Sequence, residues 1–137
     1  MAVVNGTIFS DNGSSGTGFP LLGTAAADTL NANWSAGSDW MFGGAGNDEY
    51  RVNSTGDVVA EASGNGTDTI ASRLASYTLA SNFENLTLDN TAGFLTALNG
   101  TGNSANNVIT GNSNDNILTG LGGNDTIIAG LGDDTLI

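Results

Sequence analysis

The sequence predicts an all-β fold, a parallel β-solenoid of roughly nine-residue half-coils with about six coils. Three observations support this prediction. An apolar residue recurs every nine to eleven residues from Leu30 to Leu136, an acid or asparagine often stands two places before it, and glycines crowd the intervals. A unit of this length has room for one tight turn and one short strand. Residues two places apart in a strand share a face, so the recurrent apolar residue is expected to face the core.

The composition of the 137-residue chain excludes several functions. Aspartate and glutamate number 14 against two basic residues, and the net charge of −12 disfavours contact with nucleic-acid phosphates or an anionic membrane. The 39% of hydrophobic residues argues against an acidic disordered tail. Histidine and cysteine are absent, which excludes histidine-dependent nucleophilic catalysis, thiolate zinc sites and disulfides. We therefore expect no enzyme, no nucleic-acid partner and no membrane insertion.

Residues 1–22 precede the repeat and are expected to form an N-terminal cap or docking segment. They contain two apolar, strand-like pieces, AVVNGTIF and GFPLL, without acidic turns. Such pieces either cover the first coil or dock on another subunit. The first residues lack the basic region and the long apolar stretch of a cleaved signal peptide.

Residues 23–137 form the predicted solenoid domain, and its apolar beat divides it into two sheets. One sheet is expected to contain Leu30, Tyr50, Ile70, Leu88, Ile109 and Ile127, and the other Met41, Val59, Leu79, Leu98, Leu118 and Leu136. Leu79, Leu88 and Leu98 have no acid two places before them. They are assigned to the apolar series because its spacing continues through them from the repeats on both sides. Steps of eleven residues at Met41, Ile70 and Ile109 predict longer or bulged turns.

Acidic residues recur along each edge of this solenoid about one coil apart. The predicted stacks are Asp28, Asp48 and Asp68 on one edge, Asp39 and Asp57 on the other, and, farther along, Asn107 with Asp125 and Asn116 with Asp134. Carboxylates one layer apart repel each other, and a hard divalent cation between them removes the repulsion. Calcium suits such turns because it accepts roughly six to eight oxygen ligands in flexible geometry, whereas magnesium requires a tighter octahedron.

Residues 43–51, GGAGNDEYR, match the pattern GGxGxDxUx, with U a large apolar residue, at every defined position. GLGGNDTII and AGLGDDTLI, near the end of the chain, match it in part. The pattern is the nonapeptide of the RTX, or hemolysin-type calcium-binding, family, which residues 23–137 resemble. The resemblance implies a parallel β-roll that binds several Ca²⁺ ions in its turns, and export by type I secretion.

Carried over residue by residue, the resemblance also implies the metal ligands. The carboxylate ligands would be Asp28, Asp39, Asp48, Asp57, Asp68, Asp125 and Asp134. The carbonyl ligands would be those of Gly43, Ala45, Gly46, Gly122, Gly123 and Gly132. Asn116 is counted as a ligand of a weaker site, because Asn107 and Asn116 lack the charge of the acid. Most turns between residues 71 and 106 lack the glycine–aspartate signature and are expected to bind no calcium.

Simpler explanations exist for single residues. One aspartate before an apolar residue is most simply a solvated side chain in an Asx-turn, but seven in phase with the apolar beat favour a metal. The aromatic residues either pack in the core and at its edges, which we favour, or form a sugar-binding platform; they are Trp34, Trp40, Phe42, Phe83 and Phe94. The acids form a regular ladder rather than one distinctive pair, which argues against glycoside hydrolysis.

The function expected from these observations is that of a secreted, calcium-binding structural protein. The last coil is expected to expose a strand edge and an open core, which favours head-to-tail self-association into an extracellular filament, matrix or surface layer. A cell-surface or matrix polysaccharide is a further candidate partner. The alternative is a C-terminal folding and secretion module of a larger RTX exoenzyme or adhesin.

Overall fold

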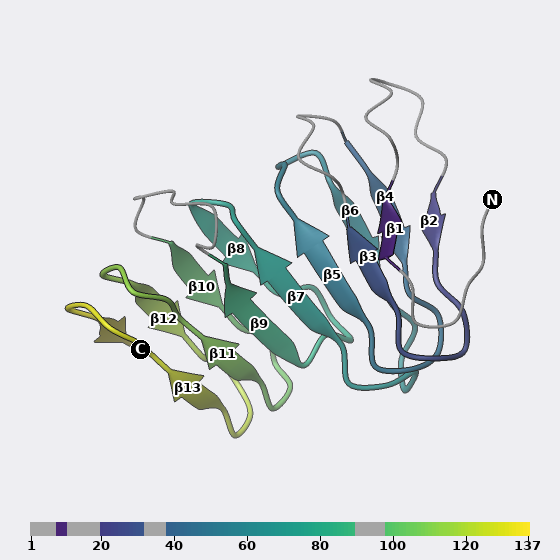
Figure 1. Cartoon of the computed structure of the whole chain (residues 1–137). Coiled ribbons are helices and arrows are strands. Elements are labelled where there is room, and N and C mark those ends of the chain that lie inside the picture. The colour runs from purple at the N-terminus through teal and green to yellow at the C-terminus, as the bar shows by residue number, and fades with distance from the viewer. Residues whose placement is uncertain (1–7, 11–19, 32–37, 90–97) are drawn as a thin grey trace.

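The computed structural model describes residues 8–10, 20–31, 38–89 and 98–137 (Figure 1), and the structural statements below refer to these residues. It confirms the all-β fold and the parallel solenoid. Trp34, Phe94 and most of the predicted N-terminal segment lie outside the described residues. The described part of the chain contains no helix that is long and apolar enough to cross a membrane.

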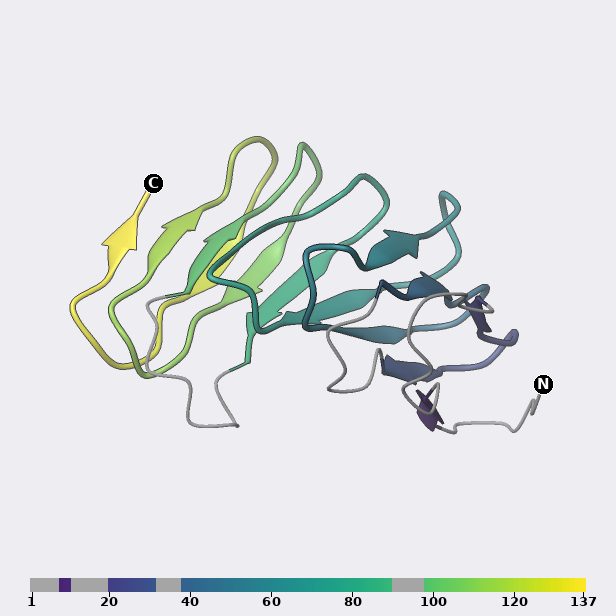
Figure 2. The same ribbon diagram turned by 90° about the horizontal axis from the view of Figure 1, so that it is seen from above.

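One wall of the solenoid is a seven-stranded parallel sheet. Its strands, in spatial order, are β1 (Ile8–Ser10), β3 (Thr29–Asn31), β5 (Glu49–Val52), β7 (Thr69–Ser72), β9 (Asn85–Leu88), β11 (Val108–Thr110) and β13 (Thr126–Ile128). Neighbouring strands in this order are one coil apart in the sequence, so each coil adds one strand to the wall. Figure 2 shows the coils stacked side by side along the length of the molecule.

The opposite wall consists of two shorter parallel sheets. The first contains β2 (Leu21–Leu22), β4 (Trp40–Phe42) and β6 (Val58–Ala60). The second contains β8 (Ser76–Thr78), β10 (Asn99–Thr101), β12 (Ile117–Thr119) and β14 (Thr135–Leu136). The wall is therefore divided between β6 and β8, whereas the seven-stranded sheet continues past this point through the pairing of β5 with β7.

The core contains most of the recurrent apolar residues, which stand at the eighth place of the nine-residue unit, as predicted. Leu30, Tyr50 and Ile70 lie in register on β3, β5 and β7, and each is fully buried. On the opposite wall Met41 lies in register with Val59. Successive strands thus place one apolar side chain per layer between the two walls, which removes that apolar surface from water.

The predicted register is wrong at β9. Ile70 aligns with Leu86, and Leu86 aligns with Ile109, so Leu86 holds the place that was assigned to Leu88. Leu88 instead aligns with Ser72. Both leucines are buried because residues two places apart in a strand face the same side. The spacing of the repeats on either side could not decide between two apolar residues on the same face of one strand.

The register is also wrong on the opposite wall. Tyr77 and Gly100 hold the places assigned to Leu79 and Leu98, which are buried outside the strands. A Cβ on Gly100 would lie 3.1 Å from the Leu86 side chain, so neighbouring leucines fill the space that an eighth-place side chain would take. An apolar beat cannot reveal a coil in which glycine stands at the core position.

The coil nearest the C-terminus leaves apolar side chains uncovered. Leu136 is aligned with Leu118 of the preceding coil, but it is half exposed. Leu131 and Ile137 are 74% and 71% exposed. Within the described residues, β13 and β14 are the outermost strands of their sheets, so both present an unpaired edge.

Candidate metal sites in the turns

The aspartates of one edge, which stand at the sixth place of the unit, two places before the apolar residue, stack directly on each other. Asp28, Asp48 and Asp68 precede β3, β5 and β7, and all three are buried. The backbone N–H of Asp28 donates to Asp48 Oδ1 at 2.9 Å, and that of Asp48 donates to Asp68 Oδ1 at 2.8 Å. Asp48 and Asp68 therefore each accept a hydrogen bond from the preceding coil, and the predicted stack exists.

The other predicted pairs show the same contact. The backbone N–H of one sixth-place residue donates to Oδ1 of the residue one coil later, at 2.8–3.1 Å: Asp39 to Asp57, Asn107 to Asp125 and Asn116 to Asp134. Asp39 is buried, whereas Asp57, Asp125 and Asp134 are partly exposed. The structure thus brings together every predicted side-chain pair, and in the stack of Asp28, Asp48 and Asp68 every member is buried.

A second contact ties four of the sixth-place side chains to their own turns. The backbone N–H four residues earlier in the chain donates to the side-chain oxygen, a local bond between side chain and backbone. The pairs are Thr24 with Asp28, Asn53 with Asp57, Asn103 with Asn107, and Asn112 with Asn116, at 2.6–3.1 Å. This contact satisfies one oxygen of each side chain without a metal.

Asp48 lacks this second contact because Glu61 intercepts its donor. Glu61, from the next coil, accepts hydrogen bonds from the backbone N–H groups of Gly43 and Gly44 at 3.1 and 3.2 Å, and from the Tyr50 hydroxyl. Asp48 Oδ2 is left with no hydrogen-bond partner, although Asp48 is only 2% exposed. A buried carboxylate oxygen without a partner is costly, and a bound cation is the simplest group that would satisfy it.

The electrostatics of this stack oppose its own ionisation. Burial raises the pKa of Asp48, and the negative charges of Glu61 and Asp28 add to the shift, while the backbone N–H of Asp28 lowers it. Burial also raises the pKa of Asp68 to about 6, with the charges of Glu61, Asp48 and Glu84 adding to the effect. A cation beside these carboxylates would reverse both shifts, since an opposite charge favours the ionised form.

The turn of residues 43–48 requires glycine at two places. A Cβ on Gly43 would overlap with Asp48 Oδ2 and with the Tyr50 hydroxyl, so only glycine leaves room for the carboxylate. Gly46 has a φ of 121°, in the left-handed region that favours glycine. Gly123 and Gly132 hold the same place in later turns, with φ of 102° and 116°.

The predicted carbonyl ligands lie in the turns of their predicted carboxylates. Gly43, Ala45 and Gly46 share a turn with Asp48, Gly122 and Gly123 share one with Asp125, and Gly132 shares one with Asp134. Among the described residues, no three acidic side chains converge on one point. An ion in these turns would therefore take most of its ligands from backbone carbonyls. This donor set of carbonyls and one or two carboxylates fits calcium.

Sequence reasoning missed two carboxylates that belong to the stack. Glu84 Oε2 accepts a hydrogen bond from the backbone N–H of Asp68 at 2.8 Å, so Glu84 continues the stack in the next coil. The signal was present in Glu84-Asn85-Leu86, which has the acid–skip–apolar beat with glutamate in place of aspartate. Glu61 has no such signal, because it stands at the start of its unit, where Gly43 stands in the preceding coil.

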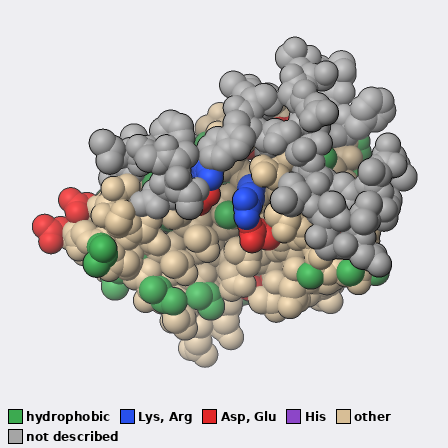
Figure 3. All heavy atoms as spheres, in the orientation of Figure 1, with side chains coloured by type: hydrophobic (Ala, Val, Ile, Leu, Met, Phe, Trp, Pro, Cys, Tyr) green, Lys and Arg blue, Asp and Glu red, His purple; other side chains and the backbone are tan. Residues whose placement is uncertain are grey.

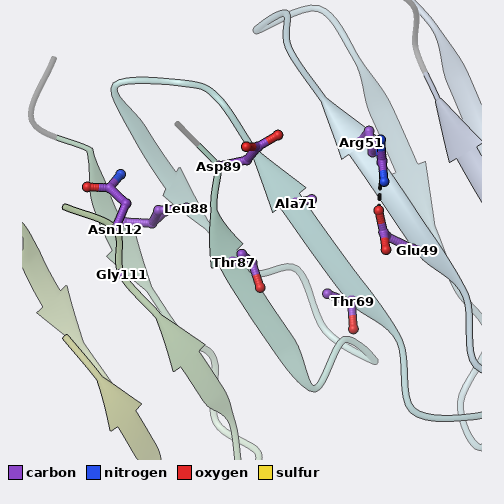
Figure 4. Close-up of a pocket in the computed structure, with 9 residues that line it drawn as sticks. All are labelled: Glu49, Arg51, Thr69, Ala71, Thr87, Leu88, Asp89, Gly111 and Asn112. Carbon is purple, nitrogen blue, oxygen red and sulfur yellow. Dashed lines mark hydrogen bonds and ion pairs between the residues drawn. The ribbon is translucent and has the colours of Figure 1, made fainter. Parts of the chain in front are cut away.

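The chain has two basic residues, and both form ion pairs with acids outside the turn stacks. Arg51 pairs with Glu49 at 2.6 Å, and Arg73 pairs with Asp89 at 2.8 Å. Figure 3 shows the two blue side chains beside red ones near the middle of one face. Glu49, Arg51 and Asp89 border a hollow of about 390 Å³ over β5, β7 and β9. Figure 4 shows the residues that line it. The hollow is lined by polar and apolar residues of these strands and of the segments that follow β9 and β11, and it does not include the stacked aspartates.

A parallel solenoid with carboxylates stacked in glycine-rich turns belongs to the class of repeat proteins that bind hard cations. The sequence model of the RTX calcium-binding nonapeptide repeat matches four copies in this chain, at residues 21–50 and 101–136. The chain is thus an RTX-type calcium-binding repeat protein. Among curated proteins and among solved structures, nothing matches it significantly. The residues between the two matched segments include β8 and β9, where the predicted register is wrong.

Proposed function

We propose that this chain is a secreted structural protein whose turns bind several calcium ions and thereby hold the coils of the solenoid together. The match to RTX calcium-binding repeats supports calcium as the ligand. The single observation that carries the proposal for this chain is Asp48 Oδ2, a buried carboxylate oxygen without a hydrogen-bond partner inside a stack of like charges.

The stack of Asp28, Asp48 and Asp68 would hold calcium together with carbonyl oxygens of the glycine-rich turns. The ion supplies positive charge to turns in which burial and neighbouring carboxylates oppose ionisation. Without it, Asp28 Oδ1 and Asp48 Oδ2 lack partners in the described structure. Calcium therefore stabilises the folded state rather than taking part in a reaction, and the proposal includes no catalytic role.

The location we propose is extracellular, with export by type I secretion. RTX repeat proteins are typically secreted, which supports this location. A calcium-dependent fold also suits such a route, because free calcium is scarce in a cytosol and abundant outside cells. The chain would then complete its folding where the ion is available.

The structural role we propose is head-to-tail self-association into filaments, a matrix or a surface layer. The unpaired edges of β13 and β14, together with the exposed Leu131, Leu136 and Ile137, support it. Contact between opposite ends of a solenoid does not close on itself, so it produces filaments. The alternative is a folding and secretion module of a larger RTX exoprotein, in which further chain would cover this edge.

Two measurements test the proposal separately. Calcium titration of the chelated chain, followed by circular dichroism and calorimetry, is expected to show binding coupled to a gain of β-structure; a folded chain that binds no calcium would refute the calcium-binding role. Electron microscopy with calcium and after chelation is expected to show rods that chelation disperses. Monomers in both conditions would reject self-association and leave the module as the surviving role.

A further inference from the structure

Glu84 occupies the same place in its coil as the stacked aspartates. Thr69 and Ile70 of β7 are in register with Asn85 and Leu86 of β9, so the residues that precede these pairs, Asp68 and Glu84, are also level. The backbone N–H of Asp68 donates to Glu84 Oε2, just as that of Asp48 donates to Asp68 Oδ1. The longer side chain of glutamate therefore brings its carboxylate to the next position of the stack.

One coil later, Asn107 replaces the carboxylate with an amide. Asn107 Nδ2 donates to the carbonyl oxygens of Phe83 and Glu84 in the preceding coil, at 3.2 Å each. Its Oδ1 accepts from the backbone N–H of Asn103 at 2.7 Å, and the residue is 1% exposed. Both polar atoms of this buried side chain are thus satisfied within the protein.

Asn116 makes the equivalent contacts on the opposite edge. Its Nδ2 donates to the carbonyl oxygen of Leu98 at 2.7 Å, and its Oδ1 accepts from the backbone N–H of Asn112 at 2.9 Å. A carbonyl oxygen in these turns needs a partner that carries positive charge. Either a bound cation or the partial positive charge of an N–H donor can fill this role. The amide does so without adding negative charge to the stack.

The two kinds of turn differ in what remains unsatisfied when no metal is present. In the aspartate turns, Asp28 Oδ1 and Asp48 Oδ2 are buried without hydrogen-bond partners. In the asparagine turns, the side-chain oxygen and nitrogen both have partners. The aspartate turns thus leave buried acceptors, which a cation would satisfy. In the asparagine turns the buried atom without a partner is Asn112 Nδ2, a donor that a cation cannot satisfy.

We propose that Glu84 is the last carboxylate ligand in the unbroken run of acids that begins at Asp28, and that Asn107 and Asn116 close the following coils with their own amide groups. The segment 99–119, which contains β10, β11 and β12, therefore keeps its structure without calcium, while the coils of Asp28, Asp48 and Asp68 depend on it. This inference rests on the proposed calcium binding and adds where the dependence on calcium is interrupted.

Hydrogen exchange of the full chain, read by mass spectrometry with calcium and after chelation, tests the boundary. Peptides from segment 99–119 are expected to stay protected in both conditions, whereas peptides that contain Asp48 and Asp68 lose protection on chelation. Uniform loss along the chain would overturn the boundary. If the chain bound no calcium at all, no peptide would respond, and that outcome refutes the proposed function itself.

Glu84→Gln tests the ligand, because glutamine keeps an acceptor for the backbone N–H of Asp68 while it removes the charge. We expect calorimetry to show one site lost or its affinity lowered roughly tenfold, since calcium affinity follows the charge of the ligands. Glu49→Gln, on the outer side of β5, is the matched control and should bind calcium like the wild type. If Glu84→Gln also does so, Glu84 is not a ligand. Should Glu84→Gln not fold in calcium, Glu84→Asp serves instead, and it must weaken binding because its arm is shorter.

Asn107→Asp tests whether the amide of Asn107 takes the place of a cation, because it changes the amide to a carboxylate. Aspartate removes the Nδ2 donor and adds a buried charge, so segment 99–119 is expected to lose protection on chelation and to regain it with calcium. Asn106→Asp adds the same charge at an exposed place in the same turn and should leave the segment protected. If the two variants exchange alike after chelation, the amide of Asn107 does not replace a cation.

Discussion

Asp48→Asn gives the sharpest test of the metal site, because it changes the charge of Asp48 while keeping its shape. The asparagine Oδ1 can still accept from the backbone N–H of Asp28, which now donates to Asp48 Oδ1 at 2.9 Å. The amide nitrogen would replace Oδ2, the oxygen that has no partner. This oxygen and the Tyr50 hydroxyl both lie on the side of Gly43 where a Cβ would stand.

The expected magnitudes differ between the two conditions. In chelator, the variant removes a buried unpartnered acceptor, and the free energy of unfolding should rise by about 1–3 kcal/mol. In calcium at about 100 times its dissociation constant, one bound ion contributes about 2.7 kcal/mol, and the variant should lose this contribution. The stabilisation that calcium adds is thus expected to shrink by about 2.7 kcal/mol, while the calcium-free protein becomes more stable.

Urea unfolding, followed by circular dichroism in chelator and in calcium, measures both quantities. Asp115→Asn is the matched control. Asp115 is an exposed acid in a turn, and replacing it changes the net charge by the same amount. It should shift both conditions by less than about 0.5 kcal/mol. If Asp48→Asn destabilised the protein equally with and without calcium, Asp48 would be a structural residue and the metal site would lie elsewhere.

Three further predictions concern the same stack. Gly43→Ala should lower the free energy of unfolding by more than about 2 kcal/mol and weaken calcium binding, because the new Cβ overlaps with the Asp48 carboxylate. Gly122→Ala should lower it by less than about 1 kcal/mol, because the nearest atom is 3.7 Å from the new Cβ. Urea unfolding distinguishes the two variants. Tyr50→Phe should lower the free energy of unfolding by about 1–3 kcal/mol, since it removes a buried hydroxyl that donates to Glu61 of the next coil. Similar urea midpoints for variant and wild type would contradict this role. In chelator, the unfolding free energy should fall as the pH rises from about 4 to about 6, because the raised pKa of Asp68 means that the folded chain holds this proton more tightly than the unfolded chain; a urea midpoint that rises over this range would refute the assignment.

The sequence predicts the fold where each unit carries its own signature. In units such as GGAGNDEYR, the turn glycines, the aspartate and the core residue are all present, so each unit fixes its own phase. The positions of Leu30, Tyr50 and Ile70 in the core and of Asp28, Asp48 and Asp68 in one stack follow directly. Parallel pairing then requires no further information, because equivalent places in successive coils lie side by side.

The middle of the chain could not be predicted in this way because its units lack the signature. Gly100 stands at a core position, which breaks the apolar beat, and two leucines compete for one place in β9. Only contacts between coils decide between Leu86 and Leu88. Register in this region depends on packing across layers, which a linear pattern does not contain.

The partners of the site residues depend on contacts between coils for the same reason. The sequence does not show that Glu61 reaches back to the backbone N–H groups of Gly43 and Gly44 and so deprives Asp48 of its donor. Nor does it show that the amide nitrogen of Asn107 points at carbonyl oxygens of the preceding coil. Both contacts arise only after the coils have stacked.

The number of calcium ions bound to the folded chain is the most direct test of the central claim, that cations offset stacked carboxylates. Native mass spectrometry of the full chain, desalted with and without prior chelation, counts these ions, and circular dichroism on the same samples reports the fold. We predict several bound ions and a loss of β-structure when they are removed. A chain that carries no ion and keeps an unchanged spectrum after chelation would contradict the claim.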